Sequence, residues 1–187
     1  MNYIINLHGY NGNKNNNIFK ILKNMKFNYD VKIISIQLSN KPKEDFKMLV
    51  NFVKRLDSSV VITAKSLSSF YACLLNSMFK IPCICFNPSF DPLKNIVFKD
   101  ENDIEFIKEK DFKNFDFDQD IACFMSTNDN RIDHLEHIKK YPFLKYTENI
   151  IVDDHDHDFT KLESDKETVN LFKNLIEYYF LKLSKLI

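Results

Sequence analysis

The chain has 187 residues and a formal charge of +0, with 26 basic and 26 acidic residues. This balance argues against a dedicated nucleic-acid-binding protein and against a polybasic membrane anchor, since both carry an excess of positive charge. A hydrophobic content of 44% with 18 Phe excludes a disordered chain, and only 2 Gly are present, so no glycine-rich phosphate-binding loop exists.

Short apolar runs rich in Val and Ile predict six β-strands, each of which is long enough to cross a buried sheet. In chain order they span residues 3–7, 31–36, 59–63, 82–86, 121–126 and 149–152. Near-continuous apolar runs are typical of strands that are buried on both faces, as in a parallel sheet.

Stripes of apolar residues with helical spacing lie between these runs, most clearly within 46–56, 67–78 and 169–183. Alternation of strands and helices predicts an α/β fold with a mostly parallel sheet of about six strands and helices on both faces. The length fits one domain, which we place over residues 1–187.

The segment 93–120 breaks this alternation because it is acidic and carries scattered Phe without a strand pattern. Long irregular insertions in compact domains often act as lids over a binding site. A surface excursion that packs a few Phe side chains on the core would produce the same pattern. We therefore expect either a short lid or such an excursion at 93–120.

The chain carries no evident targeting signal, because its first residues lack the basic region and apolar core of a signal peptide. No stretch approaches the ~18 apolar residues of a membrane-spanning helix. The four cysteines, Cys73, Cys83, Cys85 and Cys123, show no C-x-x-C spacing. We therefore expect a cytoplasmic protein with reduced, buried thiols in preference to a zinc site.

Both glycines, Gly9 and Gly12, lie in the segment LHGYNG at 7–12, directly after the first predicted strand. Frequent Asn, Lys, Ile and Phe are residues with A/T-rich codons, so a biased genome could have removed most glycines. Those that survive are expected where only Gly reaches a positive φ at no steric cost. A loop at a strand end of such a sheet lines the ligand crevice and can aim a backbone N–H at an oxyanion. An ordinary tight turn is the alternative.

Ser66 stands where the strand at 59–63 gives way at once to the helical stripe at 67–78. This context predicts a nucleophile elbow, a strained strand-to-helix turn that exposes a serine hydroxyl. The helix N-terminus there favours developing negative charge. The two flanking positions that are Gly in the usual G-x-S-x-G pattern are Ala64 and Ser68, the next smallest residues. A plain helix N-cap is the alternative role of Ser66.

The acid candidate is Asp129, in the polar turn after the strand at 121–126, with Asp133 as the second choice. A carboxylate there would lie at the same edge of the sheet as Ser66. Asp is also a common turn and cap residue, which is the structural alternative.

The base candidates are His155 and His157, in the Asp-rich segment that follows the strand at 149–152. Either could take the Ser66 proton while Asp129 holds the imidazole tautomer. The order Ser, Asp, His along the chain is that of α/β-hydrolases. Two His with neighbouring Asp are also ligand types for a metal, and a solvated acidic loop is a third interpretation.

Taken together, these segments resemble the YqiA-type esterases, a family of small α/β-hydrolases. The resemblance rests on LHGYN at 7–11, AKSLSSFYA at 64–72, the pair Asn87-Pro88, and DHDF at 156–159. It extends from the first predicted strand to the last helix and so covers nearly the whole chain.

The resemblance implies a role for five residues. Ser66 would be the nucleophile, His157 the general base in preference to His155, and Asp129 the acid that orients it. The backbone N–H groups of Tyr10 and Leu67 would form the oxyanion hole.

We therefore expect a serine hydrolase that cleaves small carboxylic esters or acyl thioesters through an acyl-enzyme, with no cofactor and no metal. Its expected partner is a small-molecule acyl ester or thioester, without nucleic acid or membrane. The replaced elbow glycines leave open a hydrolase-fold binding or interaction module that no longer catalyses. A metal-dependent hydrolase using His155 and His157 is a third alternative.

Overall fold

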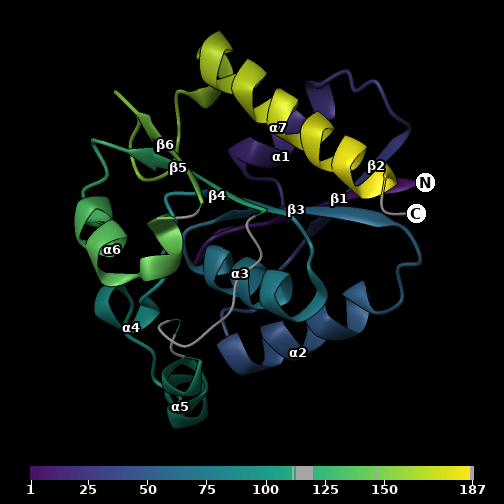
Figure 1. The fold of residues 1–187 in the computed structure, drawn as a ribbon. Helices are drawn as coiled ribbons and strands as arrows, with labels where there is room; N and C mark the ends of the chain where they lie inside the picture. The colour runs from purple at the N-terminus through teal and green to yellow at the C-terminus, as the bar shows by residue number, and fades with distance from the viewer. Residues whose placement is uncertain (111, 113–119, 146, 186–187) are drawn as a thin grey trace.

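The sheet has six strands, all parallel, in the order β2-β1-β3-β4-β5-β6 (Figure 1). The computed structural model describes residues 1–110, 112, 120–145 and 147–185. The strands are β1 (Asn2–Leu7), β2 (Val31–Ile36), β3 (Ser59–Lys65), β4 (Cys83–Phe86), β5 (Ile121–Ser126) and β6 (Glu148–Val152). The predicted α/β architecture is confirmed, and each strand lies within two residues of its predicted bounds.

Helices cover both faces of this sheet (Figure 1). On one face lie α1 (Asn17–Asn24) and α7 (Lys166–Ser184), and on the other lie α2 (Pro42–Val53) and α3 (Leu67–Phe79). The other helices of the described chain are α4 (Pro92–Asn95), α5 (Glu101–Glu109), α6 (His134–Lys140) and the 3₁₀ turns Pro142–Lys145 and Leu162–Ser164. No helix in the described part of the chain is both long and apolar enough to cross a membrane.

Successive strand residues point to opposite faces and so enter two separate apolar cores. Ile4 on β1 packs in the core under α1 and α7, whereas Ile5 packs in the core under α2 and α3. On β3, Val61 and Ile62 divide in the same way. Because both faces are covered, both residues of each pair must be apolar, which explains the unbroken hydrophobic runs in the sequence.

The segment 93–120 is described in part, since residues 111 and 113–119 lie outside the described residues. Its described part forms α5, whose Phe106 is buried against the rings of Phe46 and Phe70, at centroid distances of 5.6 and 6.2 Å. This helix therefore extends the core under α2 and α3. The expectation of a lid or a surface excursion at 93–120 stays a prediction.

Candidate active site

The loops that carry the predicted site residues leave the same edge of the sheet. Leu7 at the end of β1 pairs with Ala64 near the end of β3, and Ser126 at the end of β5 pairs with Val152 at the end of β6. Parallel strands bring their carboxyl ends together, so residues far apart in sequence meet here.

Ser66 has a strained backbone, with φ of 54° and ψ of −122°, immediately before the first turn of α3. A non-glycine residue in this region costs about 1–3 kcal/mol, and the surrounding structure must hold it. The Ser66 N–H donates to the Phe86 carbonyl (3.0 Å), while its carbonyl accepts from the N–H groups of Ser69 and Ser89. Ser66 is the N-cap residue of α3 by position, but its hydroxyl makes no capping hydrogen bond to the helix.

Ser66, His157 and Asp129 form one chain of hydrogen bonds. His157 Nε2 lies 3.1 Å from Ser66 Oγ, and His157 Nδ1 lies 2.9 and 3.0 Å from the two oxygens of Asp129. With Nδ1–H donating to the carboxylate, Nε2 is left to accept from the Ser66 hydroxyl. The structure thus brings together three residues that 28 and 91 positions separate in sequence.

Asp129 accepts more hydrogen bonds than the histidine alone supplies. The backbone N–H groups of Arg131 (2.8 Å) and Ile132 (3.2 Å) donate to it, and His134 Nε2 lies 3.0 Å from its second oxygen. Burial by itself would raise the pKa of Asp129, but the bonds from His134, His157 and Arg131 outweigh it and hold the pKa well below its usual range. The group is therefore a carboxylate across the whole neutral range.

Two other candidates from the sequence have different partners. Asp133 caps α6 through its side chain. His155 Nε2 lies 2.9 Å from Asp165 Oδ2, and its ring stacks on Phe159 at 4.8 Å. His155 and His157 therefore turn to different carboxylates rather than to one shared ligand position.

The loop after β1 approaches the turn at Ser66 so closely that a side chain on Gly9 would make tight contacts. A Cβ on Gly9 would lie 3.0 Å from Ser66 Cβ and 3.2 Å from the Lys65 carbonyl oxygen. We expected the two glycines at positions that need a positive φ. Neither Gly9 nor Gly12 has a positive φ, so that explanation is wrong. Positive φ is adopted instead by Asn11, Asn40, Ser66, Lys80, Asn87, Asp154 and Phe159, of which Asn and Asp tolerate it best.

A neutral histidine holds this loop in place. The buried His8 accepts at Nε2 from the Leu38 N–H (2.9 Å) and the Gln37 amide (2.9 Å), which leaves Nδ1–H to donate to the Gly9 carbonyl (2.8 Å). Burial lowers the pKa of His8. The next backbone N–H, that of Tyr10, donates no hydrogen bond to another described residue.

The model of an uncharacterised protein family, UPF0227, matches residues 3–174. The chain belongs to the UPF0227 family. This is the YqiA-like family to which the motifs pointed, so the resemblance is confirmed. Among curated proteins, none matches the sequence.

Solved structures similar to this UPF0227 protein include some that are described as α/β superfamily hydrolases and one that is described as an esterase. An α/β superfamily hydrolase from Oenococcus oeni has a TM-score of 0.68 at 12% identity, covering 96% of this chain and 93% of its own. Est1E from Butyrivibrio proteoclasticus scores 0.66 at 11% identity, with 96% and 87% covered. The Pyrococcus furiosus esterase Pf2001 scores 0.65 at 15% identity, with 94% and 82% covered. At these identities the likeness establishes the fold.

In this family member a serine hydroxyl occupies the elbow position of the second glycine. Ser68 is fully buried, accepts from the Lys65 N–H (2.9 Å), and lies 3.0 Å from the carbonyl oxygens of Leu7 and Lys65. It therefore links the end of β1 to the end of β3 beneath Ser66. Replacing the usual glycine added a hydrogen-bonding group where the two strand ends meet.

Asn87, part of the Asn-Pro motif, joins three loops of the site. Its amide Nδ2 donates to the carbonyls of Asp156 (3.1 Å) and His157 (3.2 Å), and its Oδ1 accepts from the Ser126 N–H (2.8 Å). The side chain is completely buried. The Asn-Pro motif of the sequence includes this residue but predicts no role for it. In the structure Asn87 connects the loop that carries His157 to the end of β5.

His134 contacts Asp129, and no sequence pattern predicted this contact. It is the first residue of α6 and lies five positions after Asp129. A histidine beside a helix-capping Asp gives no pattern of its own, so its contact with Asp129 emerges only from the fold.

A cavity of about 450 Å³ opens at Ser66 and His157. Gly9, Tyr10, Lys65 and Arg131 are among the residues that line it. Lys65 Nζ pairs with Asp158 Oδ1 at 2.6 Å, so the residue before Ser66 is bound to the residue after His157. The cavity provides room for a small molecule directly at the Ser66 hydroxyl.

Proposed function

We propose that this protein is a serine hydrolase that cleaves small carboxylic esters or acyl thioesters through an acyl-enzyme. The single observation that carries the proposal is the hydrogen-bonded chain from Ser66 Oγ through His157 to Asp129. The strained Ser66 backbone and the cavity beside it support the same reaction. The described structural neighbours include esterases, which agrees with this class of chemistry.

In the proposed reaction Ser66 Oγ attacks the carbonyl carbon while His157 Nε2 takes the hydroxyl proton. The negative charge that develops on the carbonyl oxygen is stabilised by the N–H groups of Tyr10 and Leu67, each donor contributing about 2.7–4 kcal/mol in such reactions. Leu67 is the first residue of α3, so its N–H has no acceptor within the helix. Collapse expels the alcohol or thiol, which takes the proton back from His157.

Water then hydrolyses the acyl-enzyme by the same steps, with His157 again acting as base. Asp129 stays ionised throughout and holds the Nδ1–H tautomer, since its pKa is held far below neutrality by its donors. No step requires a group beyond the residues named. The cavity of about 450 Å³ accommodates compounds with small acyl and leaving groups near the serine.

The test is the substitution Ser66→Ala assayed with short-chain p-nitrophenyl esters. We expect hydrolysis to fall by at least about 10³-fold, since the nucleophile is lost, while the circular dichroism spectrum is unchanged. Ser69→Ala, three residues further along the same buried turn, is the matched control and should retain activity, because its hydroxyl has no partner among the described residues. Full activity in Ser66→Ala would contradict the proposal.

A fluorophosphonate probe separates this enzyme from a hydrolase-fold binding module. The folded wild type should be labelled at Ser66, as mapped by mass spectrometry, and His157→Ala should greatly slow labelling. Failure of the folded wild type to label would favour the module. Survival of activity in Ser66→Ala together with its loss on adding a chelator would instead favour the metal-dependent alternative.

A further inference from the structure

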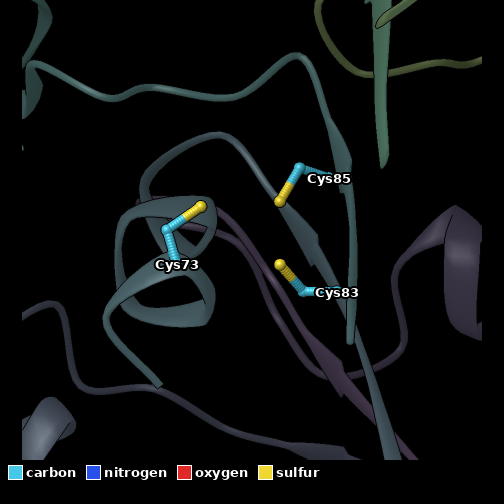
Figure 2. A group of neighbouring side chains, drawn as sticks. All are labelled: Cys73, Cys83 and Cys85. Atoms are coloured by element: carbon cyan, nitrogen blue, oxygen red, sulfur yellow. The ribbon is translucent and has the colours of Figure 1, made fainter. Parts of the chain in front are cut away.

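Three cysteines outside the proposed active site converge between α3 and the sheet (Figure 2). Cys73 comes from α3, whereas Cys83 and Cys85 come from β4 and point to the same side of that strand. Their sulfur atoms all lie within 4.8 Å of one another. All three side chains are fully buried and none forms a disulfide.

The neighbours of these sulfurs are more polar than the core around them. Ser69, one helical turn before Cys73, has a buried hydroxyl without a hydrogen-bond partner in the described part of the chain, and it lies next to Cys85. Cys123 stands opposite Cys85 on the adjacent strand β5. Packing of a small apolar side chain explains one buried thiol. It does not explain why three sulfur atoms lie within 4.8 Å of one another.

We propose that Cys73, Cys83 and Cys85 together bind one soft monovalent metal ion, Cu(I), in a three-coordinate site made only of sulfur. Sulfur ligands select soft ions such as Cu(I) over hard ones.

Geometry also favours three-coordinate Cu(I) over zinc. Structural zinc takes four ligands, and the group of ligand atoms within 4.8 Å of one another comprises three sulfurs in the described chain, without that of Cys123. Metal–sulfur bonds of about 2.3 Å place three sulfurs about 4 Å apart. The present arrangement reaches this spacing with side-chain shifts of less than about 1 Å.

The experiment measures Cu(I) retained by the full chain. Because the thiols are fully buried, the protein is unfolded and refolded without oxygen in the presence of one equivalent of Cu(I), then desalted and analysed for copper. We expect about one copper per chain and a copper–thiolate absorption band in the near ultraviolet. The triple variant Cys73→Ala/Cys83→Ala/Cys85→Ala should retain none, while the matched control Cys123→Ala should retain copper.

Folded wild type without bound copper would overturn the proposal, as would equal retention by the triple variant, which would locate the copper elsewhere. If the triple variant does not fold, Cys73→Val replaces it, because it changes side-chain volume little and removes one sulfur. That variant should lose at least tenfold in Cu(I) affinity in competition with a chromogenic Cu(I) chelator, and an unchanged affinity would reject the site. Ser66→Ala should bind Cu(I) as the wild type does.

Discussion

Asp129 is the residue on which the proposed active site depends most closely. It receives hydrogen bonds from two histidine rings and two backbone N–H groups while its side chain is fully buried. Each bond to a charged acceptor contributes about 1.5–3 kcal/mol. The backbone donors hold the carboxylate in position, and His134 holds the oxygen that also faces His157.

We predict that His134→Ala destabilises the protein by about 1.5–3 kcal/mol at pH 7, because one charged acceptor loses a buried donor. The pKa of Asp129 should rise toward its ordinary value. A depressed Asp pKa contributes stability that is present above the unfolded value of ~3.9 and is lost as pH falls. The difference between variant and wild type in urea unfolding should therefore stay constant from pH 7 to about pH 4 and shrink below about pH 4.

His134→Gln serves as the matched variant, because its amide can donate from nearly the place of Nε2. It should recover a large part of both stability and esterase activity. Equal loss in the two variants at every pH would mean that His134 acts only by filling space.

At the scale of elements, Asn87 connects the end of β4 to the loops that carry Asp129 and His157. Its backbone has a φ of 42°, and its side chain makes three hydrogen bonds to Ser126, Asp156 and His157. Asn87 is therefore a positioning residue rather than a group that touches substrate.

We predict that Asn87→Gly lowers kcat for ester hydrolysis on the order of 10–100-fold with little change in KM, because small displacements of the base from Ser66 are costly. Glycine adopts the positive φ without strain, so the loss is due to the missing side-chain bonds. Lys80→Gly, at another positive-φ position at the far end of α3, should leave activity unchanged. An Asn87→Gly enzyme with wild-type kcat would exclude this positioning role.

The elements differ in how well the sequence predicted them. The strands matched because burial on both faces leaves a continuous apolar run. The helix α1 was not singled out, since its apolar stripe of Ile18, Ile21 and Leu22 is short and lies among asparagines. The helices α5 and α6 were also missed, because acidic residues and short length hide their buried faces.

For the whole molecule, the free energy of unfolding depends on pH through titratable groups whose pKa values folding changes. The pKa of His137 is lowered from 6.5 to about 4, first because burial disfavours the imidazolium and then because His134 lies nearby. The pKa of Asp165 is lowered to about 2, first by its hydrogen bond from His155 and then by Thr168. The two groups act in different pH ranges.

We predict that the free energy of unfolding falls as pH decreases from about 6.5 to about 4, because the unfolded chain, with His at ~6.5, binds the proton that folded His137 excludes. The loss is on the order of 3 kcal/mol. His137→Phe, which suits the aromatic contacts to Phe90 and Tyr141, should remove most of this slope in urea unfolding between pH 7.5 and 4.5.

Below about pH 4 both proteins should lose stability alike, since Asp129 and Asp165 then protonate, with Asp165 doing so down to about pH 2. A wild-type slope above pH 4 that persists unchanged in His137→Phe would show that another group is responsible.

The sequence by itself determined the α/β alternation and the family, along with Ser66, Asp129 and His157 as candidates, because each depends on local order: apolar runs, a strand meeting a helix, polar turns after strands. Tertiary structure decided which histidine faces Ser66. It also showed that Gly9 lies in close contact with Ser66 without a positive φ, that His134 contacts Asp129, and that the sulfur atoms of Cys73, Cys83 and Cys85 lie together. Such contacts join residues whose separation in the chain carries no periodic signal, since parallel strands bring distant loops to a common edge.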